Sequence, residues 1–79
     1  MQVFKHRLHE GLNTVLGVQK LLYMDFQESK LYGWFLTSPT QEEYEVYIAL
    51  TGERIPDEYH YVTSTQHVSS GYYVLHAFD

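Results

Sequence analysis

Histidine has the widest chemical repertoire of the residue types in this chain, because imidazole can transfer protons and bind metals. The chain contains His6, His9, His60, His67 and His76. On an extended strand His6 and His9 point to opposite faces, as do His60 and His67, because their separations are odd. Cysteine is absent and no His-x-His pair occurs. The spacing therefore predicts neither a metal site nor a bound cofactor.

The other candidates for chemistry are serines and paired carboxylates. No serine lies in a Gly-x-Ser-x-Gly turn, and Ser69-Ser70-Gly71 has the composition of an ordinary turn. The pairs Glu42-Glu43 and Asp57-Glu58 fall in turn-like segments, whereas catalytic carboxylates need a water-poor cleft. A chain of 79 residues has little room for such a cleft. We expect no catalytic residue and no enzymatic activity.

Aromatic side chains are the main surplus, with eight Tyr, four Phe and one Trp. Most of these rings are expected in the core. Tyrosine also suits interfaces, because its ring is apolar and its tip is polar. The rings predicted to line a partner interface, or to stack on a flat ligand, are Tyr47, Tyr59, Tyr61 and either Tyr72 or Tyr73.

A loop between two predicted strands is the candidate recognition surface. It places Glu53 and Arg54 beside aromatic rings, a mixture found at the centres of interfaces. An architectural interpretation stays open, in which Gly52 supplies a positive φ and Ile55-Pro56 closes one end of the core. In that case binding would use the exposed face with Glu43, Glu45 and Tyr47. The predicted binding residues are Thr51, Gly52, Glu53, Arg54, Ile55, Pro56, Tyr59 and Tyr61.

Short strands must position these residues. Residues 43–50 alternate cleanly, with Val46 and Ile48 in the set assigned to the core. Residues 20–27 and 30–37 form a predicted hairpin around a short polar loop, and the second run is apolar on both faces, which is typical of a central strand. Gly33 is expected to mark a bulge or a close backbone contact.

Three further strands are predicted at residues 2–8, 59–67 and 72–78. Residues 12–18 are compatible with a short helix, because Leu12, Val15 and Leu16 have helical spacing, although Gly17 weakens it. The fold class is mainly β: one domain over residues 1–79, with a small antiparallel sheet of five to six strands curled into a sandwich or open barrel. Strands that are apolar on both faces also suggest a homodimer.

Composition limits the partners. Five Lys and Arg stand against ten Asp and Glu, and no basic run occurs, so a nucleic-acid partner is not expected. The acidic surface favours solubility or a basic partner. The sequence shows no signal-peptide pattern and no run of about 20 apolar residues, so we expect a soluble intracellular protein with no membrane partner.

The sequence resembles a family of small phage and prophage proteins of unknown function. The resemblance includes Leu31–Leu36, similar to an aromatic "L-x-x-W-x-L" strand, and is most specific at Leu50–Pro56, similar to a "G-T-G-x-x-I-P" loop. The chain ends in His76–Asp79, similar to "H-x-F-E". It departs from the family at Leu50, where glycine is usual, and at Asp79, where glutamate is usual.

The resemblance implies a β fold and a phage origin, and it supplies no activity, catalytic residue or cofactor. Two classes of function follow. The first is a non-catalytic binding protein that sequesters or inhibits a protein of the bacterial host in the cytoplasm. The second is a small-ligand binder, in which the aromatic residues and the loop Thr51–Pro56 enclose a nucleotide-like molecule. A minor structural component of the virion is a third alternative.

Overall fold

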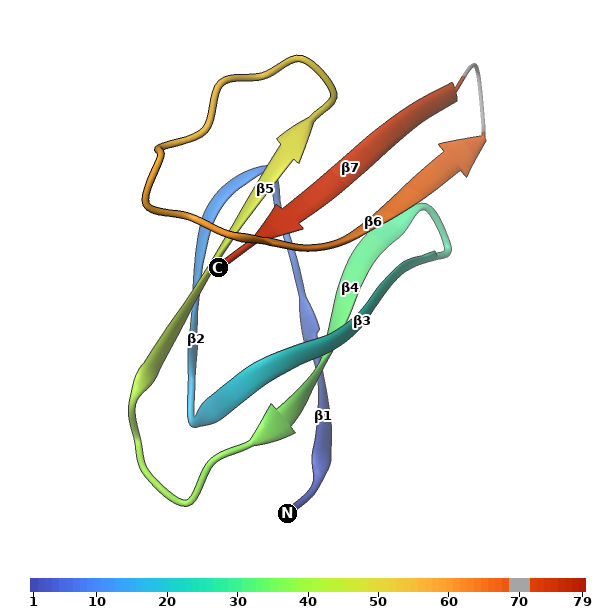
Figure 1. Cartoon of the computed structure of the whole chain (residues 1–79). Coiled ribbons are helices and arrows are strands. Elements are labelled where there is room, and N and C mark those ends of the chain that lie inside the picture. Colours follow the sequence, from blue (N-terminus) through green and yellow to red (C-terminus); the bar gives the residue numbers. More distant parts are fainter. Residues whose placement is uncertain (69–71) are drawn as a thin grey trace.

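The computed structural model describes residues 1–68 and 72–79, which form two antiparallel sheets packed as a sandwich (Figure 1). One sheet has the order β1-β4-β3 and the other β2-β5-β7-β6. The predicted mainly-β, antiparallel class is confirmed, but the expected five to six strands were too few. The strands are β1 (Val3–Arg7), β2 (Gly11–Leu16), β3 (Val18–Gln27), β4 (Lys30–Thr37), β5 (Glu43–Leu50), β6 (Tyr61–Val68) and β7 (Tyr72–Phe78).

The core fills the space between the sheets. Alternate residues of each strand point inward, as the pleat of a strand requires. Phe35 of β4 and Val46 of β5 are fully buried, which confirms the inward face predicted for residues 43–50. The buried core cluster consists of Leu8, Val15, Val18, Leu21, Met24, Leu31, Phe35, Val46, Ile48, Leu75 and Ala77.

The predicted hairpin of residues 20–27 and 30–37 is confirmed as β3 and β4, joined by Glu28 and Ser29. Both turn residues have positive φ, 52° and 67°, as a two-residue hairpin turn that follows the twist of its strands requires. β4 is the central strand of its sheet, as its two apolar faces predicted. Gly33 faces the core in regular register with its neighbours, and the atoms that approach it closely belong to side chains rather than to another backbone.

The short helix considered for residues 12–18 is wrong. These residues form β2 and the start of β3, and the chain bends between the two at Gly17, whose φ is +78°. Val15 is buried, whereas Leu12 and Leu16 are exposed on the opposite face. Gly17 also bonds to the segment before β5, because its amide donates to the Glu42 carbonyl at 3.0 Å. Nothing described forms a helix that could cross a membrane.

The four-stranded sheet carries the candidate binding residues. The strand predicted at residues 72–78 is present as β7, which lies between β5 and β6. The strand predicted at residues 59–67 is present as β6. The connection from β5 to β6 forms a wide arch beside β5 and β7 in Figure 1. The turn predicted at Ser69-Ser70-Gly71 lies outside the described residues.

Candidate functional site

A row of apolar side chains crosses the outer face of the four-stranded sheet. Leu12 of β2 lies opposite Tyr47 of β5, Tyr47 lies opposite Phe78 of β7, and Phe78 lies opposite Tyr61 of β6. Residues directly opposite each other point to the same side of a sheet. Leu12 is 53% exposed and Tyr61 is 62% exposed, so both ends of the row are open to solvent. We call these four residues the aromatic row.

Tyr59 extends this row from the β5–β6 loop. Its ring centroid lies 5.6 Å from that of Tyr47, and its hydroxyl donates to Glu45 at 3.2 Å. Desolvation, followed by the hydrogen bond to Glu45 and the negative charge of that carboxylate, raises the pKa of Tyr59. The hydrogen bond to Glu45 and the contact with Tyr47 hold the Tyr59 ring against the sheet.

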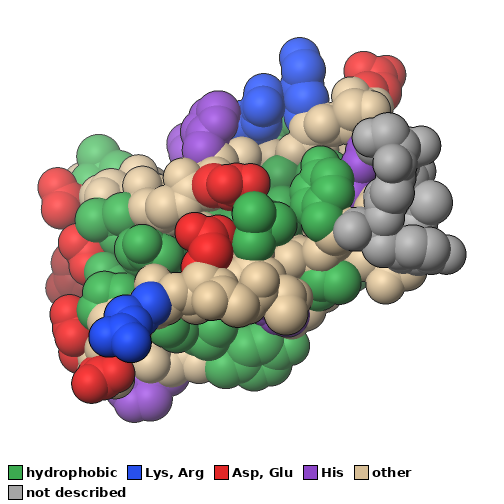
Figure 2. Space-filling view, turned by 90° about the horizontal axis from the view of Figure 1, so that it is seen from above, with side chains coloured by type: hydrophobic (Ala, Val, Ile, Leu, Met, Phe, Trp, Pro, Cys, Tyr) green, Lys and Arg blue, Asp and Glu red, His purple; other side chains and the backbone are tan. Residues whose placement is uncertain are grey.

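An acidic depression of about 500 Å³ adjoins the aromatic row. In the view of Figure 2, acidic side chains crowd one side of the visible face, beside apolar ones. Carboxylates in a shallow depression attract a cationic group, and tyrosine rings can contact it through their faces. The lining residues are Glu43, Tyr44, Glu45, Glu58, Tyr59 and Asp79, none of which is Lys or Arg.

Tyr44 lines the depression and is half-buried. Its hydroxyl donates to the Asp79 carboxylate and accepts a hydrogen bond from the Leu21 amide of the other sheet. Burial raises the pKa of Tyr44, and the hydrogen bond to Asp79 raises it further. Asp79 is fixed in turn, because its backbone exchanges two 2.8 Å hydrogen bonds with His60. Two backbone contacts and one side-chain contact thus hold this carboxylate at the rim.

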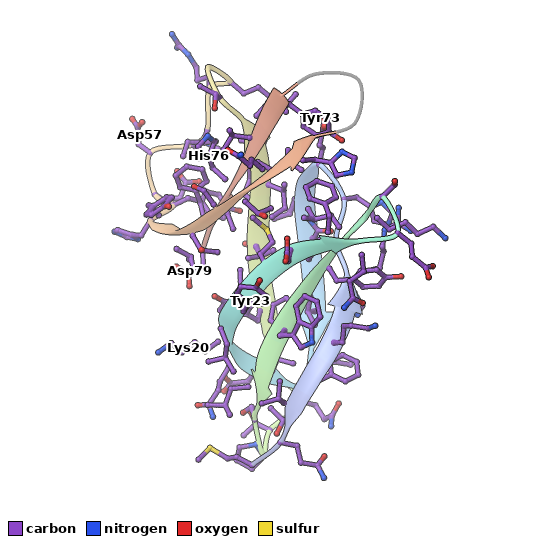
Figure 3. All side chains as sticks on the ribbon, turned by 90° about the vertical axis from the view of Figure 1, so that its right-hand side faces the viewer. Lys20, Tyr23, Asp57, Tyr73, His76 and Asp79 are labelled. Carbon is purple, nitrogen blue, oxygen red and sulfur yellow. The ribbon has the colours of Figure 1, made fainter. Side chains whose placement is uncertain are left out.

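A hydrogen-bonded network of hydroxyl groups and one imidazole borders the other side of the aromatic row. His76 contacts Thr51 through Nε2 and Ser64 through Nδ1, at 2.7 Å in both cases, and Tyr61 contacts Ser64 at 2.8 Å. Figure 3 shows His76 on β7. A neutral imidazole both donates and accepts, so this network fixes the ring and ties Thr51 and Tyr61 to the sheet.

The Ser64–His76 distance matches that of a nucleophile and its base, but the rest of such a site is missing. In the described contacts the second nitrogen of His76 faces Thr51 rather than a carboxylate. No group of three or more His, Asp or Glu residues in the described chain could hold a metal ion. Hydrogen bonds hold the polar groups of this network in place.

The predicted loop has both architectural and exposed parts. Gly52 has φ +91°, and Glu53 closes the turn, because its amide donates to the Leu50 carbonyl and its carboxylate accepts from the Leu50 amide at 2.6 Å. Arg54 and Pro56 are exposed, and Ile55 is half-buried. The positive φ expected at Gly52 is present, whereas Pro56, expected to close one end of the core together with Ile55, is exposed.

The structure joins two surfaces that the sequence offered as alternatives. Tyr59, predicted to begin the strand beside the loop, lies before β6 and contacts Tyr47 and Glu45, which belong to the alternative face. Leu12, Phe78, His76 and Asp79 also belong to this surface, and the sequence did not single them out as candidates. Their signal is the cross-strand register, which joins residues far apart in the sequence. We call the aromatic row, Tyr59 and the acidic depression together the recognition face.

Comparison with known proteins gives a family and no further relative. A family model described as a domain of unknown function (DUF7352) matches residues 1–79, the whole chain. No curated protein and no solved structure matches the sequence.

Proposed function

Because the chain belongs to the DUF7352 family, whose description assigns no function, we propose a role from its recognition face: it is a non-catalytic protein-binding module. Its partner is a protein segment that presents Lys or Arg beside an apolar side chain. The observation that carries the proposal is the aromatic row, which is continuous across four strands and adjoins a depression lined by four carboxylates and no cation. Protein interfaces commonly combine aromatic residues at the centre with charged groups at the rim.

The resemblance to small phage and prophage proteins supports a biological setting for this module. We propose that it is encoded by a phage and acts in the cytoplasm of an infected bacterium, where it sequesters or inhibits a host protein. The charge of the recognition face fits that role, because electrostatic attraction speeds the encounter with a basic partner.

Capture from a bacterial lysate, with and without a matched pair of charge changes, tests this proposal. The double variant Glu45→Gln and Glu58→Gln removes two negative charges from the depression and leaves the side-chain oxygens that accept hydrogen bonds. The control Glu10→Gln and Glu28→Gln removes the same charge from exposed residues outside the depression.

We expect mass spectrometry to identify a basic partner that the parent and the control capture equally. The depression variant should bind it at least about tenfold more weakly, which corresponds to ~1.4 kcal/mol. Equal binding by all three proteins would contradict a role for the depression. A captured small molecule in place of a protein would instead support the alternative of a ligand-binding protein.

A further inference from the structure

The outer face of the three-stranded sheet is a second surface, separate from the recognition face. Leu31 and Phe35 of β4 are buried in the core. Successive side chains of a strand alternate between its two faces, so Tyr32 and Trp34 point outward. Tyr23 of β3 lies opposite Trp34 and is 54% exposed. The Trp34 ring centroid is 5.5 Å from that of Tyr23 and 6.5 Å from that of Tyr32. We call Tyr23, Tyr32 and Trp34 the stacking face.

Cations surround the stacking face. Lys5 lies opposite Trp34, and its Nζ is 4.7 Å from the centre of the Tyr32 ring. Arg7 lies opposite Tyr32, and Lys20 lies opposite Leu36 on the same side of the sheet. With Lys30 at the start of β4, the strands of this sheet carry four of the five Lys and Arg residues of a chain whose net charge is −5. Figure 3 shows Lys20 and Tyr23 on β3.

The single acidic residue within β1, β3 and β4 is already engaged. Asp25 accepts hydrogen bonds from the Tyr23 hydroxyl at 2.8 Å, from the Phe26 amide at 2.8 Å and from Thr65 of β6 at 3.2 Å. Its charge is therefore partly compensated by these donors. Asp25 lies opposite Tyr32, so its carboxylate belongs to the same outer face as the stacking residues. The four cations still outnumber this one carboxylate on the strands of the three-stranded sheet, whereas the depression beside the other sheet is acidic.

From this arrangement we propose that the stacking face binds single-stranded nucleic acid. Open bases can stack on tyrosine and tryptophan rings, and Lys or Arg side chains beside the rings can neutralise the phosphates of the same strand. A duplex is a poor fit, because its base faces are already stacked on one another. The expectation against nucleic acid rested on net charge and on the absence of a basic run. Cross-strand pairing, however, brings Lys5, Arg7 and Lys20 to one face from separate segments.

The fluorescence of Trp34 reports binding, because Trp34 is the only tryptophan of the chain and lies in the proposed site. The probes are short oligothymidylate and oligouridylate, which separate DNA from RNA as the source of the strand, and a DNA duplex of the same length. We expect the single strands to quench Trp34 fluorescence saturably and the duplex to bind more weakly. Contacts to about three phosphates predict that the affinity falls roughly 20-fold between about 50 and 200 mM salt.

Substitutions on exposed side chains separate stacking from charge. Tyr23→Ala should raise the dissociation constant about tenfold, because it removes one stacking ring. Tyr23→Phe keeps the ring and, like Tyr23→Ala, loses the hydroxyl that donates to Asp25, so the tighter binding expected for Tyr23→Phe than for Tyr23→Ala isolates the contribution of the ring. Lys5→Gln should weaken binding and lower the steepness of the salt dependence. Arg54→Gln removes a cation from the β5–β6 loop, away from this face, and is the matched control that should leave binding unchanged.

Several outcomes would overturn the proposal. These are the absence of saturable quenching at low salt, quenching that does not depend on salt, or equal losses for Lys5→Gln and Arg54→Gln. Quenching by an acidic peptide with none by either oligonucleotide would assign the face to a protein partner instead. Quenching that depends on protein concentration alone would assign it to a second copy of the chain. The Glu45→Gln and Glu58→Gln variant should keep full oligonucleotide binding, so this test is independent of the proposed protein partner.

Discussion

Asp25 is a carboxylate that accepts three hydrogen bonds, which favour its ionised form. The hydrogen bond from Tyr23, followed by that from the Phe26 amide and then that from Thr65, lowers its pKa, and desolvation offsets part of this effect. The donors come from β3 and from β6, so the ionised side chain links the edges of the two sheets. Ionisation of Asp25 therefore favours the folded state.

The pH dependence of stability follows from this pKa. A carboxyl whose pKa is lower in the folded than in the unfolded chain stabilises the fold above its unfolded value of ~4, and this contribution is lost as the pH falls through the folded value. Asp25→Asn should therefore melt at a lower temperature than the parent near neutral pH. The difference should shrink as the pH falls below ~4.

Thermal melting followed by circular dichroism at a series of pH values checks this expectation. Asp57→Asn is the control, because Asp57 is exposed in the β5–β6 loop, and it should melt like the parent at every pH. A constant difference between Asp25→Asn and the parent down to pH ~2 would show that the carboxylate charge is not responsible.

Gly52 and Glu53 of the β5–β6 loop show which local features the residue type alone can predict. Glycine at position 52 indicated a positive φ, which the structure has. The use of the Glu53 side chain could not be inferred, because an exposed carboxylate has the same sequence signal whether it binds a partner or its own backbone. Here it accepts from the Leu50 amide and stabilises the turn.

At the scale of the elements, β4 depends on the absence of a side chain at one position. A Cβ on Gly33 would lie 2.7 Å from Phe35 Cε1 and 2.9 Å from the Cδ1 atoms of both Leu21 and Leu8. These three side chains are buried, so they have little space to move. Gly33→Ala should therefore destabilise the fold by about 1–3 kcal/mol, as overpacked cores do.

Chemical denaturation of the single and double variants measures this effect. Leu21→Ala removes one of the contacting atoms, at its own cost of about 2–5 kcal/mol. Combined with Gly33→Ala, it should cost less than the sum of the two single changes, because the new methyl group fills part of the cavity. Additive costs would mean that Gly33 matters for a reason other than close packing.

The strands that alternate most clearly were predicted well, and the ambiguous segment was not. Residues 43–50 alternate, and burial follows that alternation except at Ala49, which lies on the outward face and is nevertheless buried. In β2, Leu12 and Leu16 are exposed, so the hydrophobic pattern does not mark the inward face. The spacing of these residues with Val15 suits a helix as well as a strand, and only pairing with β5 selects the strand.

At the scale of the whole molecule, long-range pairing creates both surfaces. The aromatic row requires Leu12, Tyr47, Tyr61 and Phe78 to share one register across four strands. Register of this kind depends on turn geometry and on the packing of the two sheets, which local sequence patterns do not encode. The sequence therefore indicated Tyr47, Tyr59 and Tyr61 as surplus rings without showing that they lie together.

The edge of the four-stranded sheet is a candidate contact for the expected homodimer, distinct from the apolar strand faces on which that expectation rested. β2 pairs with β5 on one side, has no strand partner on the other among the described residues, and contains no charged residue. Uncharged edge strands are templates for pairing with another chain, and a two-fold axis would join β2 to its copy. We expect sedimentation at high micromolar concentration to show a dimer, and Thr14→Lys to shift it to monomer.

The control for this experiment places the same charge elsewhere. Thr40→Lys adds a lysine at an exposed residue of the connection between β4 and β5 and should leave the dimer intact. A parent protein that sediments as a monomer would contradict the dimer itself. A dimer that survives Thr14→Lys would place the contact outside β2.

The claim that the recognition face binds a basic, partly apolar segment can be tested directly by NMR. A peptide of alternating Arg and Leu is titrated into the isotope-labelled protein, and the amide shifts are followed residue by residue. The account predicts saturable shifts concentrated at Glu45, Tyr47, Tyr59, Tyr61 and Phe78. These shifts should be strongly reduced in the Glu45→Gln and Glu58→Gln variant and retained in the Glu10→Gln and Glu28→Gln control. Shifts that are absent, spread over both sheets, or equally large in the two variants would contradict it.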